Sequence, residues 1–368
     1  MDFTETETQA ELAALAQKIF TERTTPTRLA EIESGDDKFD PALWADLAGA
    51  GILSAALPES LGGAGLGLLE KCSVLIEAGR SVAPVPYLAS IVLGAGAITR
   101  FGTAQQQEKW AAPAGRGELI LTAALAEEGA DDPAHPVTSA EPLPAGGWRL
   151  DGMKTTVPAA PLTALFLVPA ATPDGIKVFL VEPADAGVSV ERQQVTSGDS
   201  AGRVTLDGVR LSADRVLGDG AANWLDATAT VGLCAHQAGV TAKALELTAE
   251  YARTREQFGK PIGAFQAVAQ RLADAYIDVE AIRLTMWQAA WRLAAGLPCE
   301  TEIATAKFWA ADAGHRVAHT AVHVHGGVGI DVSYPLHRYF VAAKAGEFAL
   351  GGATTQLRRI GAALASGG

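Results

Sequence analysis

The sequence predicts a mainly α-helical protein with a β domain in the middle of the chain. Apolar residues recur at helical spacing up to about residue 120, and short apolar runs bounded by Pro, Gly and Asp follow. From about residue 219 the helical period returns and lengthens. We therefore expect an N-terminal helical domain over residues 1–120, a middle β domain over 121–218 that is a small β-barrel or sandwich, and a C-terminal four-helix bundle over 219–368.

The first segment predicts several amphipathic helices. Leucines and isoleucines at helical spacing indicate helices around residues 12–19 and 43–52, and two more are expected over Leu69–Gly79 and Tyr87–Phe101. Between them the paired glycines of PESLGGAGLG, Pro58–Gly67, break the pattern.

The middle segment predicts short strands. Ala164–Val168 and Val178–Val181 are apolar runs, and the alternation in Val204–Val209 is typical of a half-buried strand.

The last segment predicts long helices. Ala227–Thr254 is long enough for one helix of roughly 40 Å at 1.5 Å per residue, and the next begins near Phe265. Two further helices are expected over Ile303–His323 and Ala353–Ala363. Long helices with a wide apolar face belong in an antiparallel bundle.

Composition excludes several classes of function. The chain of 368 residues is 48% hydrophobic and 19% charged, as in globular proteins, and its net charge of −13 argues against a nucleic-acid surface. The apolar runs are too short to span a membrane, and the N-terminus is acidic where a signal peptide is basic. Three widely spaced cysteines predict buried reduced thiols, and we expect a cytoplasmic protein.

Two motifs stand out in the last segment. The first, YARTREQFGKPIGAFQ, places Arg253, Arg255 and Phe258 at a predicted helix end, with Gly259 as its C′ residue. Arginines there also complement the helix dipole, and Phe258 could simply pack on the turn. The second, HVHGGVGIDVSYPLHRYF, has a Gly-Gly pair after a helix, which allows a phosphate or another chain to approach the backbone closely.

Together, R-x-QFGKPI-x-x-FQ-x-x-x-x-x-LAD and HGGxG-x-x-x-x-YPLHRYF resemble the acyl-CoA dehydrogenase family, as do PESLGG and the helical–β–helical order. In that family a tetramer holds FAD at subunit interfaces, and the RxxFG and QxxGG motifs reach a neighbouring subunit's flavin. The resemblance implies FAD contacts from Arg255, Phe258, Gly326 and Gly327, with His323 in place of the usual Gln. An arginine fork beside open backbone suits a diphosphate.

The family's reaction needs a carboxylate base to remove the α-proton of a thioester while a hydride passes to the flavin. By resemblance the base position falls on Leu350 or Gly351. In relatives that place the base on the helix before RxxFG, it falls near Ala229, with Thr230 in place of an Arg that contacts CoA. None of these side chains accepts a proton, and Glu347 is the nearest carboxylate to the first position. We assign no catalytic residue.

Groups that face the flavin from within the same subunit are also replaced. The family's L-T-E-P-G-A-G-S-D loop corresponds to residues 125–132, where Ala126 replaces the hydroxyl that contacts the flavin. The G-x-K-x-W-I-T stretch corresponds to Gly152–Pro158, where the aromatic residue and its partner Thr are lost near Thr156.

This selective loss implies a subunit that completes a base-bearing partner. The chain resembles especially the small subunits of heterotetrameric acyl-CoA dehydrogenases with which actinobacteria degrade steroid side chains, as in cholesterol catabolism. The implied enzyme is an FAD-containing α2β2 heterotetramer that desaturates a steroid side-chain acyl-CoA in the partner's pocket. An electron-transfer flavoprotein is implied by the family as electron acceptor.

Three other hypotheses stay open. The chain could be a self-sufficient homotetrameric acyl-CoA dehydrogenase with an unrecognised base, or a scaffold that binds no flavin. It could also be a metal-binding helical protein, because His315, His319 and His323 lie four residues apart with His325 just beyond. No carboxylate joins them at ExxH spacing, and four such ligands cannot all face one centre, so we assign no metal site.

Overall fold

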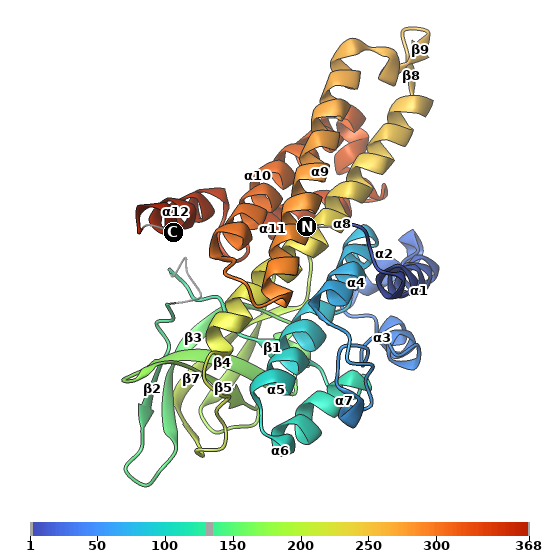
Figure 1. Ribbon diagram of the computed structural model, residues 1–368. Helices are drawn as coiled ribbons and strands as arrows, with labels where there is room; N and C mark the ends of the chain where they lie inside the picture. The colour runs from blue at the N-terminus through green and yellow to red at the C-terminus, as the bar shows by residue number, and fades with distance from the viewer. Residues whose placement is uncertain (1–2, 130–134, 367–368) are drawn as a thin grey trace. The chain divides into compact units, whose positions relative to one another are not determined.

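The computed structural model describes residues 3–129 and 135–366. The chain forms two compact units, each assembled from segments that are distant in sequence (Figure 1). The first unit comprises Met1–Pro26, Cys72–Ala83 and Thr230–Gly368, and the second comprises Thr27–Lys71 and Pro84–Ala229.

Short helices dominate the N-terminal segment, as the periodicity predicts. The α-helices are α1 (Glu7–Arg23), α2 (Pro26–Ser34), α3 (Pro41–Gly49), α4 (Leu68–Arg80), α5 (Gly96–Phe101), α6 (Ala104–Gln106) and α7 (Ala112–Gly115). The same segment also contains a 3₁₀-helix, η1 (Glu59–Leu61), and two π-helices, η2 (Tyr87–Ala95) and η3 (Gln107–Ala111).

Two N-caps show why these helices begin where they do. The hydroxyl of Thr6 accepts a hydrogen bond from the Gln9 N–H, whose side chain bonds back to Thr6 in a capping box. Asp40 caps α3 through the N–H groups of Ala42 and Leu43, and its carboxylate also binds Arg28 at 2.8 Å. The hydrogen bond from Arg28 lowers the pKa of the Asp40 carboxyl.

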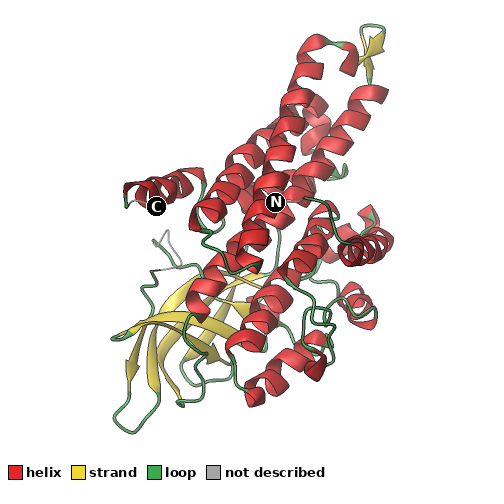
Figure 2. Ribbon diagram, viewed as in Figure 1, coloured by secondary structure: helices red, strands yellow, loops and turns green. Residues whose placement is uncertain are grey.

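The middle segment is one seven-stranded sheet (yellow in Figure 2). Its strands are β1 (Leu121–Ala123), β2 (Ser139–Pro142), β3 (Trp148–Pro158), β4 (Leu165–Thr172), β5 (Gly175–Val181), β6 (Val188–Gln193) and β7 (Ala201–Leu211). The order is β1-β4-β2-β3-β7-β6, with β5 paired to β4. Strand β4 pairs in parallel with β1 and β2, whereas the other pairs are antiparallel.

The sheet buries a continuous apolar core that includes Leu150, Phe166, Phe179 and Val204, none of which is exposed. Among the described strands, β1 and β6 end the order without pairing to each other. The predicted barrel is therefore an open half-barrel.

The C-terminal segment contains α8 (Ala221–Thr254), α9 (Gln266–Ala294), α10 (Glu300–His325), α11 (Leu336–Phe348) and α12 (Ala353–Ala365). In Figure 1, α8 to α11 run beside one another, and the β8 (Glu256–Gln257) and β9 (Lys260–Pro261) hairpin lies at one end. Their interface is rich in alanine, and a cluster around Val240, Leu336 and Tyr339 fills it.

Glycines allow the bundle helices to pack closely around the buried Gln237. Its amide donates to the carbonyls of Ala310 and Ala343 at 3.2 and 3.1 Å. A Cβ on Gly314 or on Gly346 would lie 2.4 Å from a side-chain atom of Gln237. These positions therefore favour glycine for packing.

The fold class predicted from the sequence is confirmed: helices, then β strands, then helices. The domain boundaries at residues 120 and 218 stay a prediction. All three cysteines are buried and free, and no described helix is both long and apolar enough to cross a membrane.

Two predicted elements differ from the structure. Residues Tyr87–Phe101 form η2 followed by α5 rather than one regular helix, and a Cβ on Gly94 would lie 2.5 Å from the Leu121 Cβ. The long helix α8 ends at Thr254, five residues before Gly259. Phe258 and Gly259 instead have positive φ angles of 54° and 79°, and they form the turn between β8 and β9.

Candidate functional site

The hairpin after α8 exposes two of the residues expected to contact FAD. Phe258 stands at its turn with 92% of its surface exposed, and its ring meets Phe265 edge to face at 6.1 Å. The Lys260 ammonium lies 4.4 Å from the Phe265 ring centre, so this lysine places a positive charge beside the turn.

The two arginines of the motif have different surroundings. Arg253 binds Glu250 on the preceding turn of α8 at 2.5 Å, so its charge is compensated within the helix. The Arg255 side chain is exposed and has no hydrogen bond or ion pair to any residue that the structure describes. Its backbone is fixed, because its N–H donates to the Tyr251 carbonyl and its carbonyl accepts from the Ile262 N–H, both at 2.8 Å. The guanidinium of Arg255 is therefore accessible to an external anion and is carried on a fixed backbone.

The glycine motif forms an open turn at the end of α10. Gly326 ends the helix with φ 64° and ψ −143°, a backbone conformation that is essentially restricted to glycine, and η6 (Gly326–Ile330) follows. A Cβ on Gly326 or Gly327 would meet no atom within 4 Å. His323, one turn earlier, is exposed. This backbone is thus accessible to a ligand or another chain.

An aromatic contact brings the two motifs to the same end of the bundle. Tyr251, in the last turn of α8, stacks on His325, the last residue of α10, with ring centres 4.3 Å apart and planes at 23°. His325 Nδ1 donates to the Ala321 carbonyl at 2.8 Å, which leaves Nε2 to accept from the Tyr334 hydroxyl at 3.3 Å. Burial lowers the pKa of His325, so the ring is neutral near pH 7. The sequence motifs did not identify this contact.

Comparison with known proteins identifies the family. The model "Acyl-CoA dehydrogenase, N-terminal domain" matches residues 6–118, and "Acyl-CoA dehydrogenase, C-terminal domain" matches residues 227–365. The chain is 50% identical to the acyl-CoA dehydrogenase FadE27 of Mycobacterium tuberculosis over 99% of each protein. The chain belongs to the acyl-CoA dehydrogenase family.

Solved acyl-CoA dehydrogenase structures share the whole fold. The ChsE4-ChsE5 complex from Mycobacterium tuberculosis contains a chain that is 50% identical, with a TM-score of 0.95 and complete coverage of both chains. A variant of the Tcur3481-Tcur3483 steroid ACAD contains one that is 45% identical, with a TM-score of 0.93 over 98% of both. The cofactor of the family is FAD, and these relatives are heteromeric complexes.

The positions expected to hold an acyl-CoA dehydrogenase base carry no ionisable side chain. Leu350 and Gly351 lie in the loop between α11 and α12 with positive φ angles of 57° and 87°. Ala229, the other expected base position, is buried within α8, as is Thr230, which replaces the Arg expected to contact CoA. The nearby Glu347 carboxylate binds the Lys344 ammonium at 2.5 Å and lies 3.1 Å from His315 Nδ1.

The two segments that resemble flavin-facing motifs, residues 125–132 and Gly152–Pro158, are joined by a buried ion pair. Glu127 and Lys154 are both buried, and the Lys154 ammonium donates to the Glu127 carboxylate at 2.6 Å. Burial by itself would raise the pKa of Glu127, but hydrogen bonds from Lys154, Thr138 and Val137 outweigh it and lower that pKa. Of the replaced residues, Thr156 has φ 47° and its N–H donates to Gln193 at 2.6 Å.

The backbone at Ala126 also belongs to this sheet region, because its carbonyl accepts from the Thr155 N–H at 2.9 Å. Residues 130–132 of the same loop lie outside the described residues.

The four histidines of α10 do not share one centre. His315 and His319 have ring centres 4.2 Å apart, but the Lys344 ammonium lies 2.9 Å from His315 Nδ1 and places a positive charge beside this pair. His325 is turned toward Tyr251 instead. Within residues 3–129 and 135–366, no three His, Cys, Asp or Glu side chains are grouped so that they could hold a metal ion.

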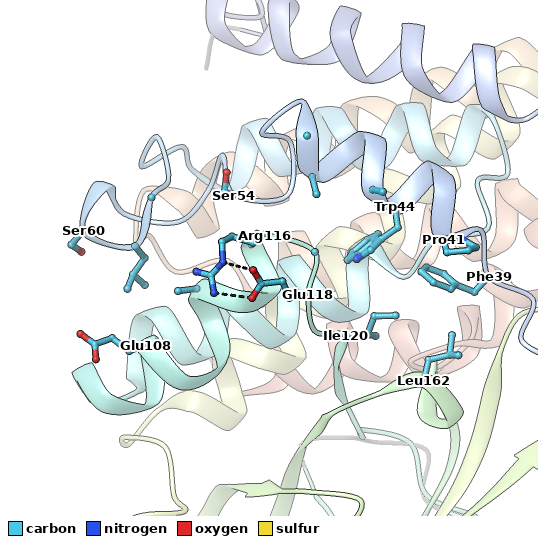
Figure 3. Close-up of a pocket in the computed structure, with 18 residues that line it drawn as sticks. Phe39, Pro41, Trp44, Ser54, Ser60, Glu108, Arg116, Glu118, Ile120 and Leu162 are labelled. Atoms are coloured by element: carbon cyan, nitrogen blue, oxygen red, sulfur yellow. Dashed lines mark hydrogen bonds and ion pairs between the residues drawn. The ribbon is translucent and has the colours of Figure 1, made fainter.

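A separate groove of about 1120 Å³ lies in the second unit, between α3, the 54–62 turn and α7 (Figure 3). Phe39, Trp44 and Leu162 form its apolar end, and the paired Arg116 and Glu118 face it further along. None of the residues predicted to contact FAD lines it.

Proposed function

We propose that this chain is the subunit of a cytoplasmic heteromeric acyl-CoA dehydrogenase that lacks a catalytic base and completes the FAD site of a base-bearing partner subunit. The partner would supply the carboxylate and hold the substrate, for which a steroid side-chain CoA ester is proposed. The relatives with 50% and 45% identity support this, because both occur in two-protein complexes and one is called a steroid enzyme.

One observation carries the proposal. Arg255, Phe258, Gly326 and Gly327 are all exposed, and the Tyr251–His325 stack joins their two motifs at one end of the bundle. By contrast, the expected base positions carry only Leu, Gly and Ala. The exposed groups are thus accessible to a ligand outside the chain.

The exposed residues fit FAD in chemical type. The unpaired guanidinium of Arg255 would hold the diphosphate by charge-assisted hydrogen bonds, and the open backbone of Gly326 and Gly327 would allow close approach. Phe258 would pack against the adenine end, with His323 beside it. When bound, FAD supplies the hydride acceptor of the desaturation.

The test uses the two arginines as a matched pair in the complex with a base-bearing acyl-CoA dehydrogenase from the same organism. Arg255→Ala removes contacts worth about 1.5–3 kcal/mol, so the Kd for FAD should rise roughly 10- to 100-fold. Arg253→Ala, in which the lost charge was already paired with Glu250, should leave the Kd unchanged. Equal FAD binding in both variants would contradict the proposal.

The self-sufficient alternative predicts a different result for the chain expressed without a partner. A homotetramer that binds FAD stoichiometrically and desaturates an acyl-CoA would replace our proposal. We expect the isolated chain to have no such activity, and the complex to contain both flavin and activity.

A further inference from the structure

We infer that Tyr251, His325 and Tyr334 form a positioning clamp that fixes Arg255 relative to the Gly326–Gly327 turn. The inference rests on the proposed function, because it assigns these three rings to alignment of the FAD contacts. They touch neither FAD nor substrate in this assignment; they act through the residues beside them.

The first half of the clamp connects Tyr251 to Arg255. Both belong to the same terminal turn, since the Arg255 N–H donates to the Tyr251 carbonyl at 2.8 Å. The helix ends there, and Arg255 passes directly into the β8–β9 hairpin. A shift of the Tyr251 ring would therefore be transmitted to the backbone that carries the guanidinium.

The second half connects His325 to the glycines. Gly326 follows His325 directly, and its N–H is bound by the carbonyls of His323 and Val322. The turn then folds back over the histidine, because a Cβ on Gly329 would lie 3.1 Å from the His325 Cβ. The glycine turn thus packs against the base of the His325 side chain, and a displacement of His325 would move the turn.

Hydrogen bonds fix the His325 ring in one tautomer and one orientation. Nδ1 must carry the proton, because its partner at 2.8 Å is the Ala321 carbonyl, and Nε2 accepts from Tyr334. Tyr334 is itself held, since its N–H donates to the Asp331 carbonyl and its own carbonyl accepts from His337. With Tyr251 stacked on the other side, both ring nitrogens and a ring face are engaged.

Simple filling of the core does not require this arrangement. Tyr251 and Tyr334 are only partly buried, at the end of the bundle, and the three rings lie 4.3, 5.3 and 6.5 Å from one another. An aliphatic cluster would cover the same surface without fixing an angle. A polar aromatic triad sets both a distance and an orientation between the two chain segments.

The test measures the Kd for FAD of the flavin-stripped heteromeric complex by titration, together with its unfolding temperature. Tyr251→Leu removes the stack, and His325→Phe keeps a ring but removes both hydrogen bonds. We expect each to weaken FAD binding about tenfold or more, which corresponds to about 1.4 kcal/mol. The control is Phe340→Leu, which removes a ring that meets His319 edge to face at 5.3 Å in the same bundle.

A double variant separates positioning from general destabilisation. If Tyr251 acts through Arg255, Tyr251→Leu should have little further effect on the Kd in an Arg255→Ala background, so the two effects should not add. Additive effects, or an equal loss of FAD in Phe340→Leu, would overturn the clamp. So would unchanged binding in Tyr251→Leu and His325→Phe.

These outcomes also separate the clamp from the proposed function. If Arg255→Ala weakens FAD binding but Tyr251→Leu and His325→Phe do not, the clamp alone is rejected. No loss in any of the three would reject the proposed function as well.

Discussion

Replacing Gly327 by alanine tests whether this position requires glycine for the folding of its own chain or for the approach of a ligand. In the chain itself the added methyl group meets no atom within 4 Å, and Gly327 is not among the glycines with positive φ. The free energy of unfolding should therefore be unchanged or rise by about 0.4–1 kcal/mol, as for other Gly→Ala changes at compatible positions.

In the flavin-containing complex the same methyl group should interfere. It would separate the backbone from the diphosphate and remove a hydrogen bond to a charged group, worth about 1.5–3 kcal/mol, so the Kd for FAD should rise roughly 10- to 100-fold. The assay is flavin titration of the complex, with circular dichroism for stability. Gly361→Ala is the control, because Gly361 lies on α12 with equally open surroundings.

Equal FAD affinity in Gly327→Ala and Gly361→Ala would refute the reasoning. Gly326→Ala is less informative, because φ 64° and ψ −143° would strain an alanine by about 1–3 kcal/mol whether or not a ligand binds.

Two further predictions concern buried lysines. Lys154→Met leaves the Glu127 carboxylate buried without its cation and should cost about 3–5 kcal/mol in thermal or denaturant unfolding, whereas Lys109→Met, at an exposed pair, should cost less than about 1 kcal/mol. Burial lowers the pKa of Lys307 from 10.5 in the unfolded chain to about 8 in the folded protein. Between pH 8 and 10.5 the unfolded chain therefore binds more protons than the folded protein. The free energy of unfolding should rise by about 3 kcal/mol as the pH increases across this range. Lys307→Met should lack this rise, and an identical pH dependence in both proteins would show that Lys307 does not titrate there.

The sequence predicted elements well where local periodicity decides the structure. The long helix α8 was expected over Ala227–Thr254 and spans Ala221–Thr254, so its last residue was predicted and its first six residues were missed. The turn after it was interpreted wrongly, since a glycine followed by Lys-Pro is compatible with a helix C-cap and with a hairpin. Pairing of Glu256 with Pro261 and of Gln257 with Lys260 selects the hairpin.

Contacts between distant residues could not be predicted in the same way. The Tyr251–His325 stack joins positions far apart in sequence, and neither residue interrupts the helical pattern around it. Glu127 and Lys154, 27 residues apart, lie in separate motifs, and only the sheet brings them together. The residues expected to contact FAD came from family resemblance, and that assignment stays a prediction.

The intramolecular partners of motif residues help to separate stability from function. Glu127 and Lys154 match the family motifs, but they bind each other in the core, so folding alone is reason enough to retain them. Arg255 matches its motif equally well and has no side-chain partner among the described residues. No ion pair or side-chain hydrogen bond within the described residues therefore explains why Arg255 is present. Arg255, rather than the buried ion pair, is therefore the residue to test first for binding of an external anion.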